Sequence, residues 1–371
     1  MSAGASITNP ARPRSTTRPF TNPASASPRP DSGSRTVFRA ARTRSRSDES
    51  ARTRPPCQRR VAVISPSLAR VIPLEFAIAR PVVLIAGATA TGKSTLALEK
   101  ARELDGVVVN ADSQQLYDGL RILTARPSPD DEALAPHFLY GVADAAEAWS
   151  VGRWLRAVEQ LMAEESRPLV IVGGTGLYFH ALTRGLAPTP PVDPGVRQAV
   201  QETYDLEGEP VIRQALAEVD PQAAARIEAG DRQRLVRALA VARSTGRTLT
   251  AWREVPTQPL LEPGAFYACV VERPREAIYA RCDARVEAMV ADGALEEVAK
   301  LLGRNLDPAL PLMKSVGVGE LAAHLHGELG LADAIDRMKT QTRRYAKRQL
   351  TWFRNQTPDW PRLAIDRLVA S

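Results

Sequence analysis

A short run rich in glycine, with one lysine and one serine, has the composition of an anion-binding loop. The glycines let the backbone turn its N–H groups inward around an anion, and the helix that follows presents its positive end to the same anion. Lysine adds a charge for an outer phosphate, and the serine hydroxyl is a ligand for Mg²⁺. The residues that match this P-loop pattern are Gly87, Ala88, Thr89, Ala90, Thr91, Gly92, Lys93 and Ser94.

Two further polar residues follow apolar runs that have the character of buried strands. Asp112 comes directly after "GVVVNA", where a carboxylate beside the loop could take a proton from a nucleophile. Thr175 stands in "GGTGLYF", where its hydroxyl could donate to a ligand oxygen. The alternative for each residue is a helix N-cap, and for Asp112 its position at the strand end favours the functional interpretation. No acid follows the run "PLVIVGG", so the metal-binding aspartate that nucleotide hydrolases carry on a later strand is missing.

Strands and helices that alternate along the chain are needed to bring these residues together. "PVVLIAGA", "GVVVNADS" and "LVIVGGTG" are continuous apolar runs that end in glycine or polar residues, and each is followed by a helical pattern. This order predicts an α/β fold, a P-loop NTPase-like parallel sheet flanked by helices. We assign residues 79–187 to its first part and residues 264–371 to its completion, which ends in a basic helix.

The segment 188–263 has a different pattern. After a proline-rich exit it contains four successive amphipathic helical stretches and no convincing strand, which predicts an all-helical insertion domain. Near the end of the chain, "KTQTRRYAKRQLTWFR" combines cations and aromatic residues on one long helix. Such a density of cations suits contact with phosphate or an RNA backbone, although a solvated face is the common alternative. We expect Tyr345, Trp352 and Phe353 to be core anchors.

The net charge of +7 comes from the beginning of the chain, because residues 1–60 contain 13 arginines and three acids. We expect residues 1–78, rich in Arg, Ser and Pro, to be disordered. They could be a solvated tail, a transit peptide or an extension from a misplaced start codon. No apolar run approaches the roughly 20 residues that span a bilayer, so we expect no membrane segment. Three sparse cysteines predict neither zinc nor disulfides and favour a reducing, cytoplasmic compartment.

Five stretches taken together resemble one known family. In order they are "GATATGKS", "NADSQQLYDGL", "IVGGTGLYFHALTRGL", "DRQRLVRALAV" followed by "TGRTL", and "TRRYAKRQLTWFRN". The set is similar to the tRNA dimethylallyltransferases in their bacterial form, over residues 81 to 360. The last stretch and the strand end at Asp112 and Ser113 are the most specific.

The resemblance implies a reaction and a partner. The family transfers a dimethylallyl group from dimethylallyl diphosphate to the exocyclic amine of adenosine 37 of tRNA and releases diphosphate. The loop that would otherwise be assigned to ATP then holds the diphosphate of the prenyl donor, with Mg²⁺. By position, Asp112 matches the general base and Thr175 a residue at the substrate channel. The insertion domain matches the part that grips the anticodon stem-loop, and we expect a monomer.

The resemblance also implies which residues contact tRNA. By position, the matching residues are Asp112, Ser113, Gln114, Gln115, Thr175, Arg197, Gln233, Arg234, Leu235, Val236 and Arg237.

In one place the chain departs from the family pattern. The family has an aromatic and then a basic residue where this chain has Val318 and Gly319, and the basic side chain helps to hold diphosphate. Lys314, or an arginine of the last helix, is expected to replace it.

Three other functions remain open from the sequence. A small-molecule kinase with the same loop would show turnover of ATP without RNA. An enzyme that prenylates free adenine nucleotides would lack the insertion domain and the basic helix. An RNA-binding switch without catalysis would have no use for Asp112 and Thr175.

Overall fold

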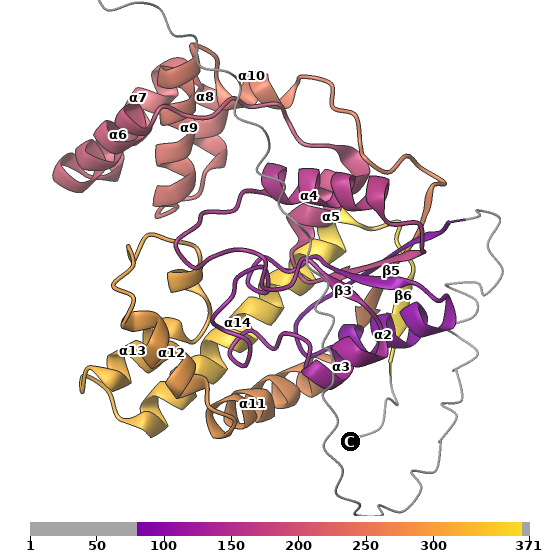
Figure 1. Ribbon diagram of the computed structural model, residues 1–371. Helices are drawn as coiled ribbons and strands as arrows, with labels where there is room; N and C mark the ends of the chain where they lie inside the picture. The colour runs from indigo at the N-terminus through magenta and orange to yellow at the C-terminus, as the bar shows by residue number, and fades with distance from the viewer. Residues whose placement is uncertain (1–79, 366–371) are drawn as a thin grey trace, which may run out of the picture. The chain divides into compact units, whose positions relative to one another are not determined.

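The computed structural model describes residues 80–365 (Figure 1). The predicted extension 1–78 lies outside the described residues. Within residues 80–365, no helix is both long enough and apolar enough to cross a membrane.

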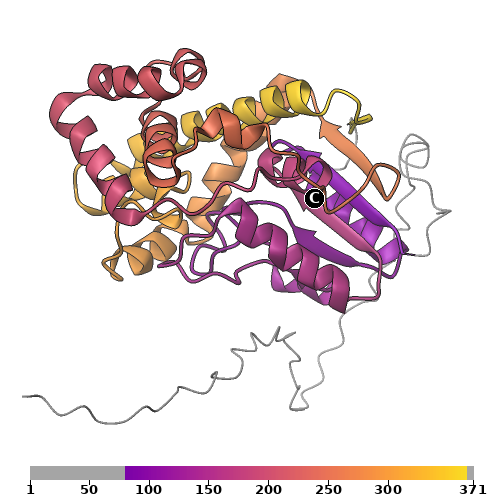
Figure 2. The same ribbon diagram turned by 90° about the horizontal axis from the view of Figure 1, so that it is seen from above.

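The centre of the fold is a six-stranded sheet in which every pairing is parallel. Its order is β3-β2-β4-β1-β5-β6, so β1, which leads into the glycine-rich loop, lies between β4 and β5. Figure 2 shows strands of this sheet running side by side. The strands are β1 (Val82–Gly87), β2 (Val107–Asn110), β3 (His137–Phe138), β4 (Leu169–Gly173), β5 (Phe266–Glu272) and β6 (Arg362–Ala364).

Both faces of the sheet are covered, which explains why its strands are apolar without alternation. Val83 and Ile85 of β1 pack with α2 (Lys93–Glu103) on one face. Helices α5 (Gly176–Arg184) and α14 (Leu331–Gln356) contact β1, and α5 also contacts α4 (Val151–Glu164). Trp154 of α4 is fully buried, donates its indole N–H to Asn110 O at 2.9 Å and stacks on Tyr178.

Five helices form a unit with its own core, inside the segment predicted as the helical insertion. Residues of α6, α7, α8 and α9 make up this core, and α10 contacts α8 and α9. Aspartate side chains cap three of these helices, since Asp193, Asp220 and Asp231 accept N–H bonds at their starts. The helices are α6 (Pro194–Glu207), α7 (Glu209–Val219), α8 (Pro221–Arg226), α9 (Arg232–Thr245) and α10 (Leu249–Arg253).

The remaining helices surround the edge of the sheet where the loop lies. The long helix α14 packs against α11 (Arg275–Ala291) and α13 (Val318–Leu325), while α12 (Ala294–Leu302) contacts both α11 and α13. Gly293, at a φ of 107°, separates α11 from α12 as the sequence indicates. A 3₁₀ turn, η1 (Leu312–Lys314), precedes α13, and α3 (Pro129–Leu134) precedes β3.

The predicted fold class is confirmed by this arrangement. The strand–helix alternation, the helical insertion and the long last helix are all present. Sequence patterns missed the short elements α3, β3, α10, α13 and β6, because segments of two to eight residues carry too few periods to be recognised.

Gly173 and Gly319 form a matched pair that tests the packing at the end of the strands. A Cβ at Gly173 would lie 2.0 Å from Ala111 O, whereas a Cβ at Gly319 has no heavy atom within 4 Å. We expect Gly173→Ala to lower the free energy of unfolding by about 3 kcal/mol, at the upper end of overpacking. Gly319→Ala should be neutral or stabilising by about 0.4–1 kcal/mol. Urea unfolding of both variants checks this, and equal stabilities would contradict it.

Candidate active site

The glycine-rich loop joins β1 to α2 at the carboxyl edge of the sheet. Gly87 lies so close to β5 that a Cβ there would be 2.8 Å from Val271 O, which requires glycine. Gly92 adopts a φ of 95° and is the N-cap of α2, and no side chain caps this helix. The N–H groups of the first turn of α2 therefore stay available for an anion.

Cationic side chains hold the oxygen atoms of this loop. Each of four cations donates to an oxygen on a different loop residue, so the partial negative charge of these oxygens is offset within the protein. The pairs are Arg273 Nε to Thr91 O (2.8 Å), Arg281 Nε to Ala90 O (2.9 Å), Arg285 Nη1 to Thr89 Oγ1 (3.1 Å) and Lys93 Nζ to Ala88 O (3.3 Å).

Positive charge at the loop is poorly compensated. Burial is the main cause that lowers the pKa of Lys93 to about 8; nearby Arg285 also lowers it, and Asp112 is the one carboxylate that opposes the shift. The pKa of Arg285 is lowered as well, mainly by burial. Cations that lack an adequate counter-charge bind anions strongly, so an anionic ligand at this loop would relieve an existing cost.

Asp112 lies just beyond β2 with a fixed orientation. The Asn110 side chain accepts from Asp112 N–H at 2.7 Å and donates to Asp112 O at 2.9 Å. The carboxylate Oδ1 accepts from Gln114 N–H at 3.0 Å. Burial raises the pKa of Asp112, and the Lys93 ammonium and the Gln114 bond pull it back only in part. A carboxylate with a raised pKa is a stronger base, as a proton acceptor requires.

Thr175, the N-cap position of α5, reaches the same strand end. Its Oγ1 accepts from Ser113 N–H at 2.9 Å and donates to Ser113 Oγ at 3.2 Å. The Tyr345 hydroxyl of α14 forms a side-chain hydrogen bond with Thr175, and burial raises the pKa of this phenol. Thr175 does not cap α5 with its side chain, so the N-cap alternative does not explain its hydroxyl.

Gln349 of α14 connects the loop to the β4–α5 turn. Its Oε1 accepts from Thr89 N–H at 2.8 Å, and its Nε2 donates to Gly174 O at 2.9 Å. The side chain is buried, and a Cβ at Gly174 would lie 2.1 Å from the amide nitrogen. One amide group therefore sets the distance between the phosphate loop and the turn that carries Thr175.

These groups meet in one cavity of about 200 Å³. Its lining is mixed, with polar, charged and apolar side chains. The polar and charged lining residues are Thr89, Lys93, Ser94, Thr95, Asp112, Gln114, Gln115, Thr124, Arg281, Arg285, Thr342 and Tyr345, and the apolar lining side chains are Leu123, Val286, Met289, Val316 and Met338.

The structure brings most of the predicted loop and strand-end residues together here. Ala90 and Gly92 also line the cavity, while Gly87, Ala88, Thr91, Ser113 and Thr175 do not line it and make contacts within the loop and the strand ends. The predicted tRNA-contacting residues Arg197 and Gln233–Arg237 lie instead on α6 and α9 of the helical unit.

Two members of that second group need a correction. Leu235 and Val236 are buried in the core of the helical unit, so their side chains face other helices and are not available to RNA. Arg197, Gln233, Arg234 and Arg237 are exposed.

Arg281, Arg285 and Gln349 are site residues that the sequence reasoning missed. Arg281 and Arg285 are four residues apart on α11 and so share a face, a spacing that could have signalled them. Lys314 is exposed and does not line the cavity, and α11 rather than Lys314 or α14 supplies the arginines there. The expected compensation for Gly319 by Lys314 is therefore not supported.

The basic helix α14 has two kinds of surface. Arg343 pairs with Asp283 at 2.6 Å and Lys339 with Glu287 at 2.7 Å, which fixes α14 against α11. The exposed cations of this helix that make no ion pair within residues 80–365 are Arg337, Arg344, Lys347, Arg348 and Arg354. Phe353 is buried against Phe179, and Trp352 packs over Gly176, as expected of core anchors, whereas Tyr345 lines the cavity.

Comparison with known proteins decides the family. The family model described as IPP transferase matches residues 115–356. The chain belongs to the IPP transferase family. A tRNA dimethylallyltransferase of Caulobacter sp. (strain K31) is 55% identical over 285 residues, which cover 76% of this chain and 92% of that protein. The tRNA dimethylallyltransferase of Phenylobacterium zucineum is 54% identical, with the same coverage.

Solved structures of the family have the same fold. A eukaryotic dimethylallyltransferase acting on tRNA superposes with a TM-score of 0.64 at 27% identity, over 77% of this chain and 74% of that one. The tRNA isopentenylpyrophosphate transferase of Bacillus halodurans superposes with a TM-score of 0.53 at 30% identity, over 77% and 90%.

Replacement of Gln349 tests the connection that it makes. Gln349→Ala leaves Thr89 N–H and Gly174 O without their partner, and an unsatisfied buried polar group costs about 1–3 kcal/mol. We expect a loss of this size in the free energy of unfolding, and a loss of affinity for inorganic diphosphate because the loop is no longer held. Isothermal titration and urea unfolding measure the two effects. Gln160→Ala, on the exposed side of α4, is the control, and equal behaviour of the two variants would contradict the role.

Proposed function

We propose that this protein transfers a dimethylallyl group from dimethylallyl diphosphate to the exocyclic amine of adenosine 37 of tRNA and releases diphosphate. One observation carries the proposal: the cationic loop, a carboxylate of raised pKa and a group of apolar side chains line the same cavity. The names of the relatives at 54–55% identity support the same reaction.

The loop suits a diphosphate that leaves as a group. When the allylic C–O bond breaks, negative charge develops on the bridging oxygen and is stabilised by fixed donors and cations nearby. Lys93, Arg281 and Arg285 line the cavity for this purpose, together with the N-terminal turn of α2. No phosphoanhydride has to be cleaved. An aspartate at the end of β4 is therefore unnecessary, and Gly173 and Gly174 stand there.

Asp112 is suited to activate the acceptor. The adenine amine is a weak nucleophile, and it forms its N–C bond to the allylic carbon as one of its protons passes to the carboxylate. The Asn110 and Gln114 bonds hold the carboxylate toward the cavity. Ser113 and Thr175 do not line the cavity, and their mutual hydrogen bonds hold the strand end that carries Asp112.

Mg²⁺ fits the donor set without a dedicated protein cage. This ion prefers oxygen ligands and is usually bound through one or two carboxylates plus substrate phosphates. Ser94 and Asp112 both line the cavity, and within residues 80–365 no cluster of three or more His, Cys, Asp or Glu is placed to hold a metal. Ser94 would hold the ion, which would neutralise charge on the diphosphate.

The helical unit carries a group of arginines suited to phosphates of the anticodon stem. Arg226 ends α8, Arg253 ends α10, and Arg234 and Arg237 lie near the start of α9. Partial desolvation and these three neighbouring arginines lower the pKa of Arg253. Arg234 pairs with Asp231 at 3.4 Å, and Asp220 accepts bonds from Thr250 and Ala223. Arg226, Arg237 and Arg253 make no ion pair within residues 80–365, so most of the positive charge of the group is uncompensated.

The target adenosine must leave its base stack to reach Asp112, as in other enzymes that modify bases. The exposed cations of α14 would contact the backbone on either side of it. A small-molecule kinase would need neither these cations nor the helical unit. A monomeric state and a cytoplasmic location stay predictions.

Incubation of the full chain with labelled dimethylallyl diphosphate and unmodified tRNA, followed by nucleoside analysis, tests the proposal. We expect label in a prenylated adenosine at position 37. Turnover of ATP in the absence of RNA, with no labelled nucleoside, would instead identify a kinase.

Asp112→Asn should lower turnover by about 10²–10⁴-fold, the usual contribution of a positioned base, with tRNA still bound. The base acts when deprotonated. Because burial raises its pKa above the usual 3.8, kcat/KM should fall as the pH drops through that raised value. In the Asp112→Asn variant, kcat/KM should no longer show this decrease at low pH. Asp130→Asn, an exposed residue of α3, is the control. Near-normal rates for Asp112→Asn would remove the residue from its role.

Arg253→Ala should weaken tRNA binding and reduce the slope of log Kd against log salt by about 1, as expected for loss of one phosphate contact. Turnover at saturating tRNA should be unaffected. Arg243→Ala is the matched control, because nine residues along α9 place Arg243 on the opposite side of the helix from Arg234. Equal slopes for the two variants would place the RNA elsewhere.

A further inference from the structure

The apolar side chains that line the cavity have no role in binding diphosphate or in accepting a proton. If diphosphate occupies the loop and the amine approaches Asp112, these apolar side chains remain to contact the prenyl tail. A cavity of about 200 Å³ is small, since pockets for drug-sized ligands have about 300–1,000 Å³. The space for the tail is therefore limited.

The apolar end of the cavity is closed by tight packing. Gly317 has a φ of 98°, and a Cβ there would lie 2.9 Å from both Leu123 Cδ1 and Met338 Cε. Glycine thus allows the two side chains to pack directly against the backbone that precedes α13. Leu123 is 5% and Met338 1% exposed, so no open passage continues past them.

The turn that carries Leu123 is held at both ends and cannot retreat easily. The Glu297 carboxylate of α12 accepts from the N–H groups of Ile122 (2.9 Å) and Leu123 (3.0 Å). The Gln115 amide donates to Thr124 O and Ala125 O, both at 2.8 Å. A longer tail would have to displace side chains backed by these bonds.

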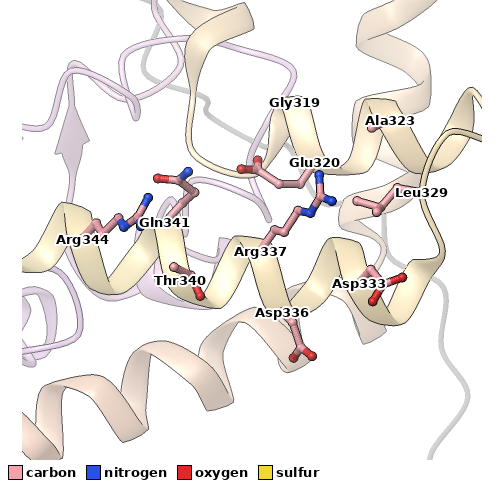
Figure 3. Close-up of a pocket in the computed structure, with 10 residues that line it drawn as sticks. All are labelled: Gly319, Glu320, Ala323, Leu329, Asp333, Asp336, Arg337, Thr340, Gln341 and Arg344. Atoms are coloured by element: carbon pink, nitrogen blue, oxygen red, sulfur yellow. The ribbon is translucent and has the colours of Figure 1, made fainter. Parts of the chain in front are cut away.

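A second, larger hollow in the structure does not offer an alternative space. It lies between α13 and α14 and has a volume of about 540 Å³ (Figure 3). Charged side chains surround it, including Glu320, Asp333, Asp336 and Arg337. An isoprenoid chain would desolvate these charges without any compensation.

We propose that Leu123, Met338 and Gly317 limit the prenyl donor to five carbons, so that the enzyme excludes the ten-carbon geranyl diphosphate. This inference rests on the proposed function and adds its donor specificity. A single methylene in an apolar pocket changes specificity by about 10–200-fold. Five additional carbons that do not fit should therefore give at least about 100-fold preference for the dimethylallyl donor.

The test is competition between dimethylallyl and geranyl diphosphate with unmodified tRNA, read by mass of the modified nucleoside. Wild type should give the five-carbon product with at least about 100-fold preference in kcat/KM. Met338→Ala and Leu123→Ala should reduce that preference by about 10-fold or more, through a gain in kcat/KM for geranyl diphosphate. Leu325→Ala, an exposed leucine of α13 outside both hollows, is the control and should leave the preference unchanged.

Comparable transfer of both groups by wild type would overturn the inference, as would an unchanged preference in folded variants. If the alanine variants fail to fold, Met338→Val and Leu123→Val provide the same comparison with less cavity.

Titration of the protein alone with the two diphosphates measures the same selectivity without transfer. Absence of any prenylated nucleoside from wild type would count against the proposed function. The relative affinities would still decide the inference, and equal affinities of wild type for the two donors would overturn it.

Discussion

The site depends on the hydrogen bonds that cationic side chains donate to the oxygens of loop 87–94. Arg273, Arg281 and Lys93 take three backbone carbonyls, and Arg285 takes the Thr89 hydroxyl. The loop can then present N–H groups and positive charge toward a single cavity. Burial, with a smaller contribution from the charge of Arg285, lowers the pKa of Lys93, and a bound polyanion would offset this cost.

Helix α14 connects this charge to the acceptor side of the site. Gln349 spans the loop and the β4–α5 turn, Tyr345 bonds Thr175, and Arg343 ties the helix to α11. One helix therefore positions donor and acceptor groups that lie on separate strands. Its outer cations remain exposed, so the element that organises the chemistry also offers a surface to RNA.

The cations at the glycine-rich loop and those on the helical unit differ in burial and therefore in the type of anion that they suit. Around the loop, burial makes each cation effective against a small polyanion at close range. On the helical unit, Arg226, Arg237 and Arg253 are exposed and act through many screened contacts, as a nucleic-acid backbone requires. Binding of RNA is therefore expected to respond strongly to salt, whereas binding of the donor responds more to pH.

Local sequence patterns predicted the fold class and several residues of the site. The loop, the apolar strands, Asp112 and the helical insertion could be read directly, because each depends on residues close together in the chain. Only the tertiary structure decided what faces the loop. Gln349 lies 260 residues from Thr89, and Arg285 lies 196 residues from it. The tertiary structure also buries Leu235 and Val236 and leaves Lys314 outside the cavity. It packs Leu123 and Met338 against Gly317. Such contacts arise when distant elements pack, and no local periodicity encodes them.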